Sequence, residues 1–340
     1  MNKQLLADLC AIDGVSGHEH KVREFILARL AESTVPMEVH VDNMGNVIVH
    51  LIGKEKANTV LQLDAHMDEV GFIVTGISED GYLRFDTVGG IDSRALFGHR
   101  VRIGAQKGVI GGKAFHQCGG DEASKVPSVS GMTIDIGAES REEAEKIVKI
   151  GNCGTFDNDL CWMGEDRFLG KAVDDRVGCL LLLELAMKQP TRDVWLSFSV
   201  QEEIGLRGAG VATEAIHPDY AVAIDATTAA DIAGNSPEQS VCFVGSGAVV
   251  SFADRATLYD PVLYQRIRSL ADEKGIPTQT KTTVAGGNNA GAMQGRHTGV
   301  HMTAVSLPCR YIHSSACMGK IQDVDAMYDL LSLLIEELTK

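Results

Sequence analysis

The chain has 340 residues and a formal net charge of −15, from 31 Lys and Arg against 46 Asp and Glu. Its hydrophobic fraction of 44% is that of a globular protein and excludes disorder along the whole length. The acidic balance argues against binding to nucleic acid or to anionic membrane lipid, because both need a basic surface.

The start of the chain and its cysteines predict a cytoplasmic protein. The first apolar stretch is short and is interrupted by Asp8 and Asp13, so it does not resemble a signal peptide. The longest apolar run, around residues 179–183, is far shorter than the ~20 residues of a membrane span. The eight cysteines include no CxxC pair, which favours reduced thiols over a disulfide framework.

Helix and strand patterns alternate over the first part of the chain. Ser16 followed by Glu19 forms a capping-box pattern ahead of apolar residues at helical spacing, which predicts a helix beginning there. Two alternating segments on either side of residues 43–45 predict a β-hairpin. The apolar segment before His66 predicts a short buried strand that ends in a polar cluster.

The pattern changes from about residue 71 to residue 165. Short β-rich segments alternate with turn residues there, with one helix-like segment at 140–150, which predicts an inserted β-rich domain. Helix and strand patterns then resume and end in an amphipathic helix, for which Asp323 is the expected N-cap. Near-continuous apolar strands between helices indicate an α/β fold with a mostly parallel sheet. We predict this fold for residues 1–68 and 166–340, with the β-rich domain at 69–165.

Five polar clusters each lie at the end of a predicted strand or just after it. They are His66 with Asp68, Asp174 with Asp175, Glu202 with Glu203, Asp225, and His313. In such sheets ligands bind beyond the carboxyl ends of the strands. Imidazoles together with carboxylates suit divalent Zn, Co or Mn. An unpaired buried carboxylate costs several kcal/mol, so these clusters together predict bound cations.

Taken alone, some of these clusters have ordinary structural interpretations. A lone His66 is more often a satisfied core histidine, and Asp174 with Asp175 could cap the helix that follows. The spacing of His66 and Asp68 favours a functional role. They lie two residues apart in an extended segment and point to the same side, so Asp68 could fix the imidazole tautomer.

The adjacent glutamates, Glu202 and Glu203, could be an exposed charge pair, although they follow an apolar strand. Neighbouring side chains of an extended segment point in opposite directions. One glutamate can therefore bind metal while the other faces a bound water. A metal-activated water with a carboxylate base is suited to hydrolysing an amide.

The segments DAHMDEVGF, GKAVDDR, EEIGLRGA and RYIHS resemble the dinuclear metallo-aminopeptidase family of the tetrahedral and glutamyl aminopeptidases. Some members of that family carry an endoglucanase label. The resemblance covers nearly the whole chain. It implies a zinc-peptidase-like catalytic domain with two divalent ions per subunit, Zn or Co, that removes amino-terminal residues from peptides. It also implies a homo-oligomer, such as a tetrahedral dodecamer, in which the inserted domain makes subunit contacts.

The resemblance also assigns metal ligands to five residues. His66 and Asp225 would hold one ion, Glu203 and His313 would hold the other, and Asp174 would bridge both.

Further roles follow from the same resemblance. Glu202 would be the general acid and base, and Asp68 would orient His66. The peptide bond between Asp174 and Asp175 would be cis.

Two segments depart from the family pattern. GGNNAGA, with Asn288 and Asn289, stands where the family usually has a Gly-Gly-Thr-Asp-Ala step, which bears on substrate contacts but on no metal ligand. The stretch HQCGGDEASKVPS, residues 116–128, is short for the corresponding family loop, which bears on the assembly and its channels.

Three other functions are weighed against this one. An endoglucanase needs two carboxyls flanking one bond, whereas Glu202 and Glu203 diverge and the aromatic content is only 5%. A related dinuclear deacylase or carboxypeptidase would use the same metals on a different end of the substrate. A binding protein without activity would not need Glu202, a carboxylate base that is not itself a metal ligand. The sequence leaves open the preferred amino-terminal residue, the physiological metal and the number of subunits.

Overall fold

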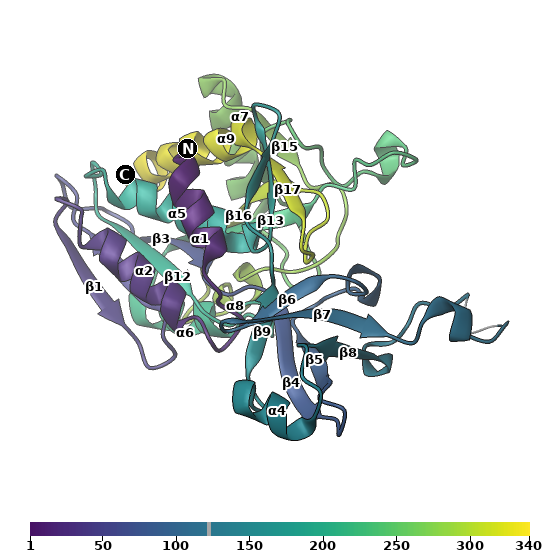
Figure 1. Cartoon of the computed structure of the whole chain (residues 1–340). Coiled ribbons are helices and arrows are strands. Elements are labelled where there is room, and N and C mark those ends of the chain that lie inside the picture. Colours follow the sequence, from purple (N-terminus) through teal and green to yellow (C-terminus); the bar gives the residue numbers. More distant parts are fainter. Residues whose placement is uncertain (121–123) are drawn as a thin grey trace.

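The chain forms a large sheet flanked by helices, with a separate β-barrel beside it (Figure 1). The computed structural model describes residues 1–120 and 124–340. The large sheet has eight strands in the order β1-β2-β12-β3-β13-β16-β14-β15. Their bounds are β1 Met37–Val41, β2 Val47–Leu51, β3 Leu61–His66, β12 Val194–Ser199, β13 Tyr220–Thr228, β14 Ala248–Val250, β15 Thr278–Thr280 and β16 His301–Cys309.

The four strands at the centre of this sheet, β12, β3, β13 and β16, run parallel to one another. The predicted hairpin of β1 and β2 joins one side by antiparallel pairing, and β14 pairs antiparallel with β16 on the other side. All six residues of β3 are buried, because the strand has neighbours on both sides and helices over both faces.

Helices cover both faces of the sheet. The main hydrophobic core lies between the sheet and α1, α2, α5, α7 and α9, and a second core lies under α6 and α8. The helices span α1 Lys3–Ala11, α2 His20–Leu30, α5 Val173–Ala186, α6 Arg207–Ile216, α7 Pro261–Lys274, α8 Ala290–Met293 and α9 Ile321–Leu338. Residues 179–183 of α5 are all buried because the helix lies between the sheet and other helices.

The β-rich segments close into a six-stranded barrel with its own hydrophobic core. Closure leaves the barrel without open strand edges. Its elements are β4 Gly71–Ile77, β5 Leu83–Val88, β6 Arg100–Ile103, β7 Gln106–Gly112, β8 Met132–Asp135, α4 Arg141–Ile147 and β9 Cys153–Phe156.

A small third sheet combines a strand of the predicted insertion with strands that lie outside the insertion. β10, Cys161–Met163, lies within the predicted insertion but pairs with β11, Arg167–Gly170, and not with the barrel. β11 in turn pairs with β17, Cys317–Lys320. Across the described residues, every helix is too short or too polar to cross a membrane.

Two predicted helix caps are wrong, because both side chains bond to distant segments instead. The Ser16 hydroxyl donates to Asp68 Oδ2 at 2.6 Å, and α2 begins at His20 with no side-chain cap. Asp323 lies inside the first turn of α9, and its carboxylate accepts the backbone N–H groups of Gly245 and Gly247 at 2.7 and 2.8 Å.

Candidate metal centre

The candidate site lies where the four central parallel strands end. Because β12, β3, β13 and β16 are neighbours that run in one direction, their carboxyl ends meet at one edge of the sheet. The side chains found there come from the last residue of β3, from β13 and from the loops after β12 and β16: His66, Asp225, Glu202, Glu203 and His313. The start of α5 faces the same place.

Asp174, at the start of α5, stands between two imidazoles. Its Oδ1 lies 3.2 Å from His66 Nε2, and its Oδ2 lies 3.3 Å from His313 Nε2. Asp225 Oδ1 is 3.8 Å from His66 Nε2, and Glu203 Oε2 is 3.3 Å from His313 Nε2. Two groups of three potential ligands therefore share Asp174, with the ligand atoms of each group within 4.8 Å of one another.

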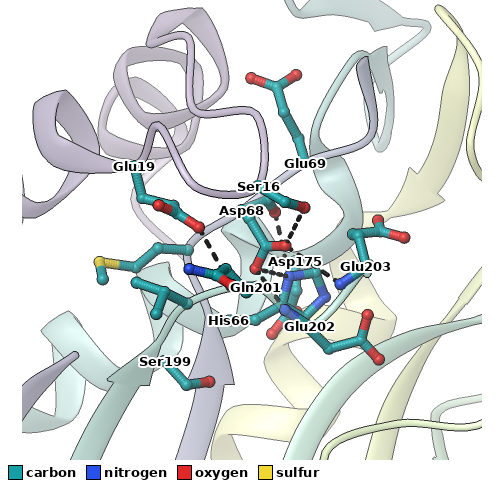
Figure 2. A network of polar contacts seen from close by, with 12 residues as sticks. Ser16, Glu19, His66, Asp68, Glu69, Asp175, Ser199, Gln201, Glu202 and Glu203 are labelled. Atoms are coloured by element: carbon teal, nitrogen blue, oxygen red, sulfur yellow. Dashed lines mark hydrogen bonds and ion pairs between the residues drawn. The ribbon is translucent and has the colours of Figure 1, made fainter. Parts of the chain in front are cut away.

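Asp68 is buried and links three segments of the chain (Figure 2). Its carboxylate accepts hydrogen bonds from Ser16 Oγ at 2.6 Å and from the backbone N–H groups of Glu202 and Glu203 at 3.0 and 3.1 Å. His66 Nδ1 lies 3.4 Å from Asp68 Oδ1 and 3.1 Å from the Asp68 backbone oxygen. Burial raises the pKa of Asp68, but His66 and these donors outweigh it and hold the pKa below its ordinary value.

The two aspartates of α5 have different partners. The peptide bond between Asp174 and Asp175 is cis, which confirms the prediction. Asp175 Oδ1 accepts the backbone N–H of Gly178 at 3.0 Å, so Asp175 caps the regular part of the helix. The structural interpretation as a helix cap thus holds for Asp175, while Asp174 faces the two imidazoles.

Carboxylates crowd around the two imidazoles, and this raises the pKa of several groups. Burial, followed by the charge of Asp174, raises the pKa of Glu203 to about 8 and that of Asp225 to about 7. Burial also holds the pKa of Glu202 well above its ordinary value. Burial lowers the pKa of His313, but its hydrogen bond to Asp174 and the charge of Glu203 outweigh this and raise the pKa to about 10.

The donor set fits divalent cations. Glu203 Oε1 is buried and has no hydrogen-bond partner among the described residues. Burying such an oxygen without a partner costs free energy unless a proton or a cation binds to it. Imidazole nitrogens and carboxylate oxygens are the ligands that zinc and similar ions take in proteins. The two groups that share Asp174 could therefore hold metal.

Asn288 and Asn289, which replace the family's usual step, are both buried in hydrogen-bond networks. Asn289 Nδ2 donates to Asp64 Oδ2 at 2.7 Å and to Ser199 Oγ at 2.9 Å. Asn288 Nδ2 donates to Tyr259 Oη at 3.0 Å. Asp64, which sequence reasoning did not identify, is fully buried in β3, and burial raises its pKa to about 6.

The chain matches known proteins along most of its length. A family model described as M42 glutamyl aminopeptidase matches residues 45–330. The chain belongs to this M42 family. It is 34% identical over 346 residues to the lysyl aminopeptidase of Pyrococcus furiosus, with 98% of this chain and 97% of the relative covered. The M42 protein is therefore a metal-dependent aminopeptidase that uses divalent metal, which confirms the activity predicted from its motifs.

Solved aminopeptidases share the fold of this M42 protein. An aminopeptidase of Desulfurococcus kamchatkensis superposes with a TM-score of 0.92 at 32% identity, covering 99% of this chain and 94% of that one. The TET1 peptidase of Pyrococcus horikoshii, described as able to assemble into a tetrahedron or a large octahedral shell, gives 0.86 at 32% identity over 98% of each chain. A Thermotoga maritima structure named endoglucanase gives 0.80 at 32% identity over 98% and 97%. The predicted α/β fold with a separate β-rich region is confirmed.

Proposed function

We propose that this M42 protein removes amino-terminal residues from peptides at a centre that binds two divalent ions, with Zn or Co as the favoured metals. His66 and Asp225 would hold one ion, Glu203 and His313 would hold the other, and Asp174 would serve both. The observation that carries the proposal is the position of Asp174, whose two carboxylate oxygens lie 3.2 and 3.3 Å from imidazole nitrogens of different histidines.

Glu202 is the proposed proton carrier. Divalent ions in such a site lower the pKa of a bound water and polarise the scissile carbonyl. Glu202 and Glu203 (Figure 2) each place a carboxylate oxygen within 4.8 Å of the other and of a His66 ring nitrogen. Glu203 also contacts His313 Nε2, at 3.3 Å, which favours Glu203 as the ligand and leaves Glu202 as the base. Burial, with the charges of Asp225 and Glu203, raises the pKa of Glu202 well above its ordinary value. A carboxylate beside the bound water could take its proton and give it to the leaving amine.

Asp68 has the proposed role of a positioning residue. It contacts His66 on the side of Nδ1 and holds the backbone N–H groups of Glu202 and Glu203. The proposed base and two proposed ligands are thus oriented by one buried carboxylate, which Ser16 holds in turn.

The alternative is a related dinuclear deacylase or carboxypeptidase, which would use the same metals on a different end of its substrate. The two functions differ in whether the amino terminus must be free. An endoglucanase fits less well, since a glycosidase needs two carboxyls flanking one bond and no imidazole pair.

Metal reconstitution tests the proposed centre. Chelator-treated protein is expected to be inactive, and added Co or Zn should restore hydrolysis of aminoacyl p-nitroanilides with free amino groups, with two ions per active chain. The N-acetylated counterparts serve as the control and should not be cleaved. Full activity with one ion or none would refute the two-metal centre, and preferential cleavage of acetylated substrates would favour the deacylase.

We also propose that the protein works as a homo-oligomer with the barrel at subunit contacts, as a dodecamer would place it. Large apolar side chains are exposed on the barrel and its loops: Phe97, Val109, Ile147 and Ile150. The stretch 116–128, which the sequence predicts to be short for the family, includes residues 121–123, which lie outside the described residues. Light scattering of active protein should give a multimer, and a monomer at micromolar concentration would contradict this proposal.

A further inference from the structure

A cavity of about 470 Å³ lies where the barrel meets the part of the chain that carries the large sheet. One wall consists of side chains between residues 13 and 21, which lead into α2 and form its first turn. The other wall comes from the turn between β6 and β7 and from β9. The lining residues that the structure describes include no candidate metal ligand. The volume is in the range of about 300–1,000 Å³ that is typical of small-molecule sites, so this is a second candidate ligand site.

The wall beside α2 is basic and has no counter-ion. His18, His20 and Lys21 line the cavity and are exposed, and their side chains have no hydrogen-bond or ion-pair partner in the described part of the chain. Asp13 is the acidic residue among the described lining residues, and it is already engaged. Its Oδ1 accepts Arg102 Nε at 2.8 Å and Thr155 Oγ1 at 2.9 Å. An ammonium and two imidazoles with free donors therefore favour an anion here.

The floor of the cavity is apolar. Val15 is 2% exposed and Ile103 is 7% exposed, and the thiol-bearing Cys153 lies on the barrel side. An apolar group that covers this floor gains free energy by leaving water. A ligand with both a carboxylate and an apolar body would use the basic wall and the floor together, whereas an inorganic anion would use only the wall.

The floor is connected to the candidate metal centre through the loop before α2. Ser16, directly after Val15, donates its hydroxyl to Asp68 Oδ2 at 2.6 Å. The backbone N–H of Glu69 donates to the backbone oxygen of Gly14 at 2.9 Å, and the N–H of Gly14 donates to Glu69 Oε1 at 3.0 Å. A ligand that packs against Val15 would thus contact the loop that holds Asp68.

We propose that this cavity binds a small carboxylate with an apolar body, and that its occupant raises turnover at the metal centre through the loop before α2. The carboxylate would lie at Lys21 and the two histidines, and the apolar body would lie on Val15 and Ile103. The bound ligand would restrain the loop and hold Ser16 on Asp68. The binding site does not depend on the proposed two-metal centre, whereas the effect on turnover rests on it.

Calorimetry with 4-methylpentanoate as the probe tests the ligand class on the metal-loaded protein. Acetate lacks the apolar body and 4-methylpentanol lacks the charge. Both are expected to bind at least about 10-fold more weakly than 4-methylpentanoate, because each loses the contacts of one wall.

Two variants test the site itself. Lys21→Met removes the unpaired charge, and Ala105→Trp adds bulk at an exposed lining position of the turn between β6 and β7. Both are expected to weaken 4-methylpentanoate binding by about 10-fold or more and to unfold at the wild-type temperature. Lys274→Met, at an exposed position of α7, changes the net charge as Lys21→Met does and should bind as the wild type does.

The thiol of Cys153 reports where the probe binds. Cys153 is partly exposed and lines the cavity, so 4-methylpentanoate should slow its alkylation by iodoacetamide, measured by peptide mass spectrometry. Cys161, exposed on β10, lies outside the lining residues and is the internal control. A carboxylate that binds only at the metals would protect neither thiol.

Turnover of leucyl p-nitroanilide tests the second part of the proposal. Saturating 4-methylpentanoate is expected to raise kcat about 5-fold, the lower end of typical allosteric couplings, and to leave kcat of Lys21→Met unchanged. Absence of binding, or binding that both variants tolerate and that leaves Cys153 unprotected, would overturn the site. Binding at the site without a rise in kcat would overturn the effect on turnover. If no aminoacyl substrate is cleaved, the proposed function fails separately, and calorimetry with Cys153 labelling still decides the binding site.

Discussion

Replacing Glu202 by Gln is expected to slow turnover at least ~100-fold without loss of metal or fold. The substitution keeps the shape of the side chain and removes the proton acceptor. The backbone N–H of residue 202 would still donate to Asp68 Oδ1, so the loop after β12 keeps its anchor. Steady-state kinetics, metal analysis and thermal unfolding of the same preparation would measure the three quantities together.

The neighbouring substitution provides the control for this prediction. Glu203 Oε2 lies 3.3 Å from His313 Nε2, and its other oxygen is buried without a partner among the described residues. Glu203→Gln should therefore lower the metal content, and excess metal should partly restore activity. Reversed phenotypes, with metal lost in the residue-202 variant and retained in the residue-203 variant, would exchange the two roles and leave the reaction class intact.

Local sequence patterns predicted most helices and strands of this fold. They did not predict that the β-rich strands close into a barrel, or which side chains form hydrogen bonds with distant segments. The strands of the barrel were recognisable from alternating residues and turns. Hydrophobic alternation does not specify which strand pairs with which, so the barrel's closure could not be predicted. Ser16 and Asp323 have the side chains of helix caps, but they bond to Asp68 and to a glycine loop far along the chain. Cap statistics describe only neighbours in sequence.

The candidate site was recognisable because its residues follow buried strands and stand in long motifs. Other buried charged residues were missed, among them Asp64 and Glu69, since each depends on a distant partner. Asp64 meets Asn289 across 225 positions of the sequence, and Glu69 meets Lys171 across 102. Burial and three-dimensional pairing carry this information, and neither can be read from a single sequence.

Glu69, directly after Asp68, is expected to be the charged residue whose loss destabilises the protein most. It is 2% exposed. Its carboxylate accepts two contacts from Lys171 Nζ, at 2.8 and 3.1 Å, and one from the backbone N–H of Gly14 at 3.0 Å. Arg176 Nη2 lies 3.5 Å away, and both cations are buried. The carboxylate thus neutralises two buried charges immediately behind the residue that orients the site.

Glu69→Gln would leave Lys171 and Arg176 without their shared counter-ion, because the Gln amide carries no charge. The NH2 group of that amide would also face the N–H donors of these two side chains. Removing one partner of a buried ion pair typically costs about 3–5 kcal/mol of unfolding free energy. Chemical denaturation measures this loss, with Glu32→Gln as the matched control. Glu32 pairs with Arg29 on the surface of the protein, and exposed pairs contribute at most about 1 kcal/mol. Equal, small losses in both variants would show that Lys171 and Arg176 are satisfied by Asp13 and by backbone carbonyls alone.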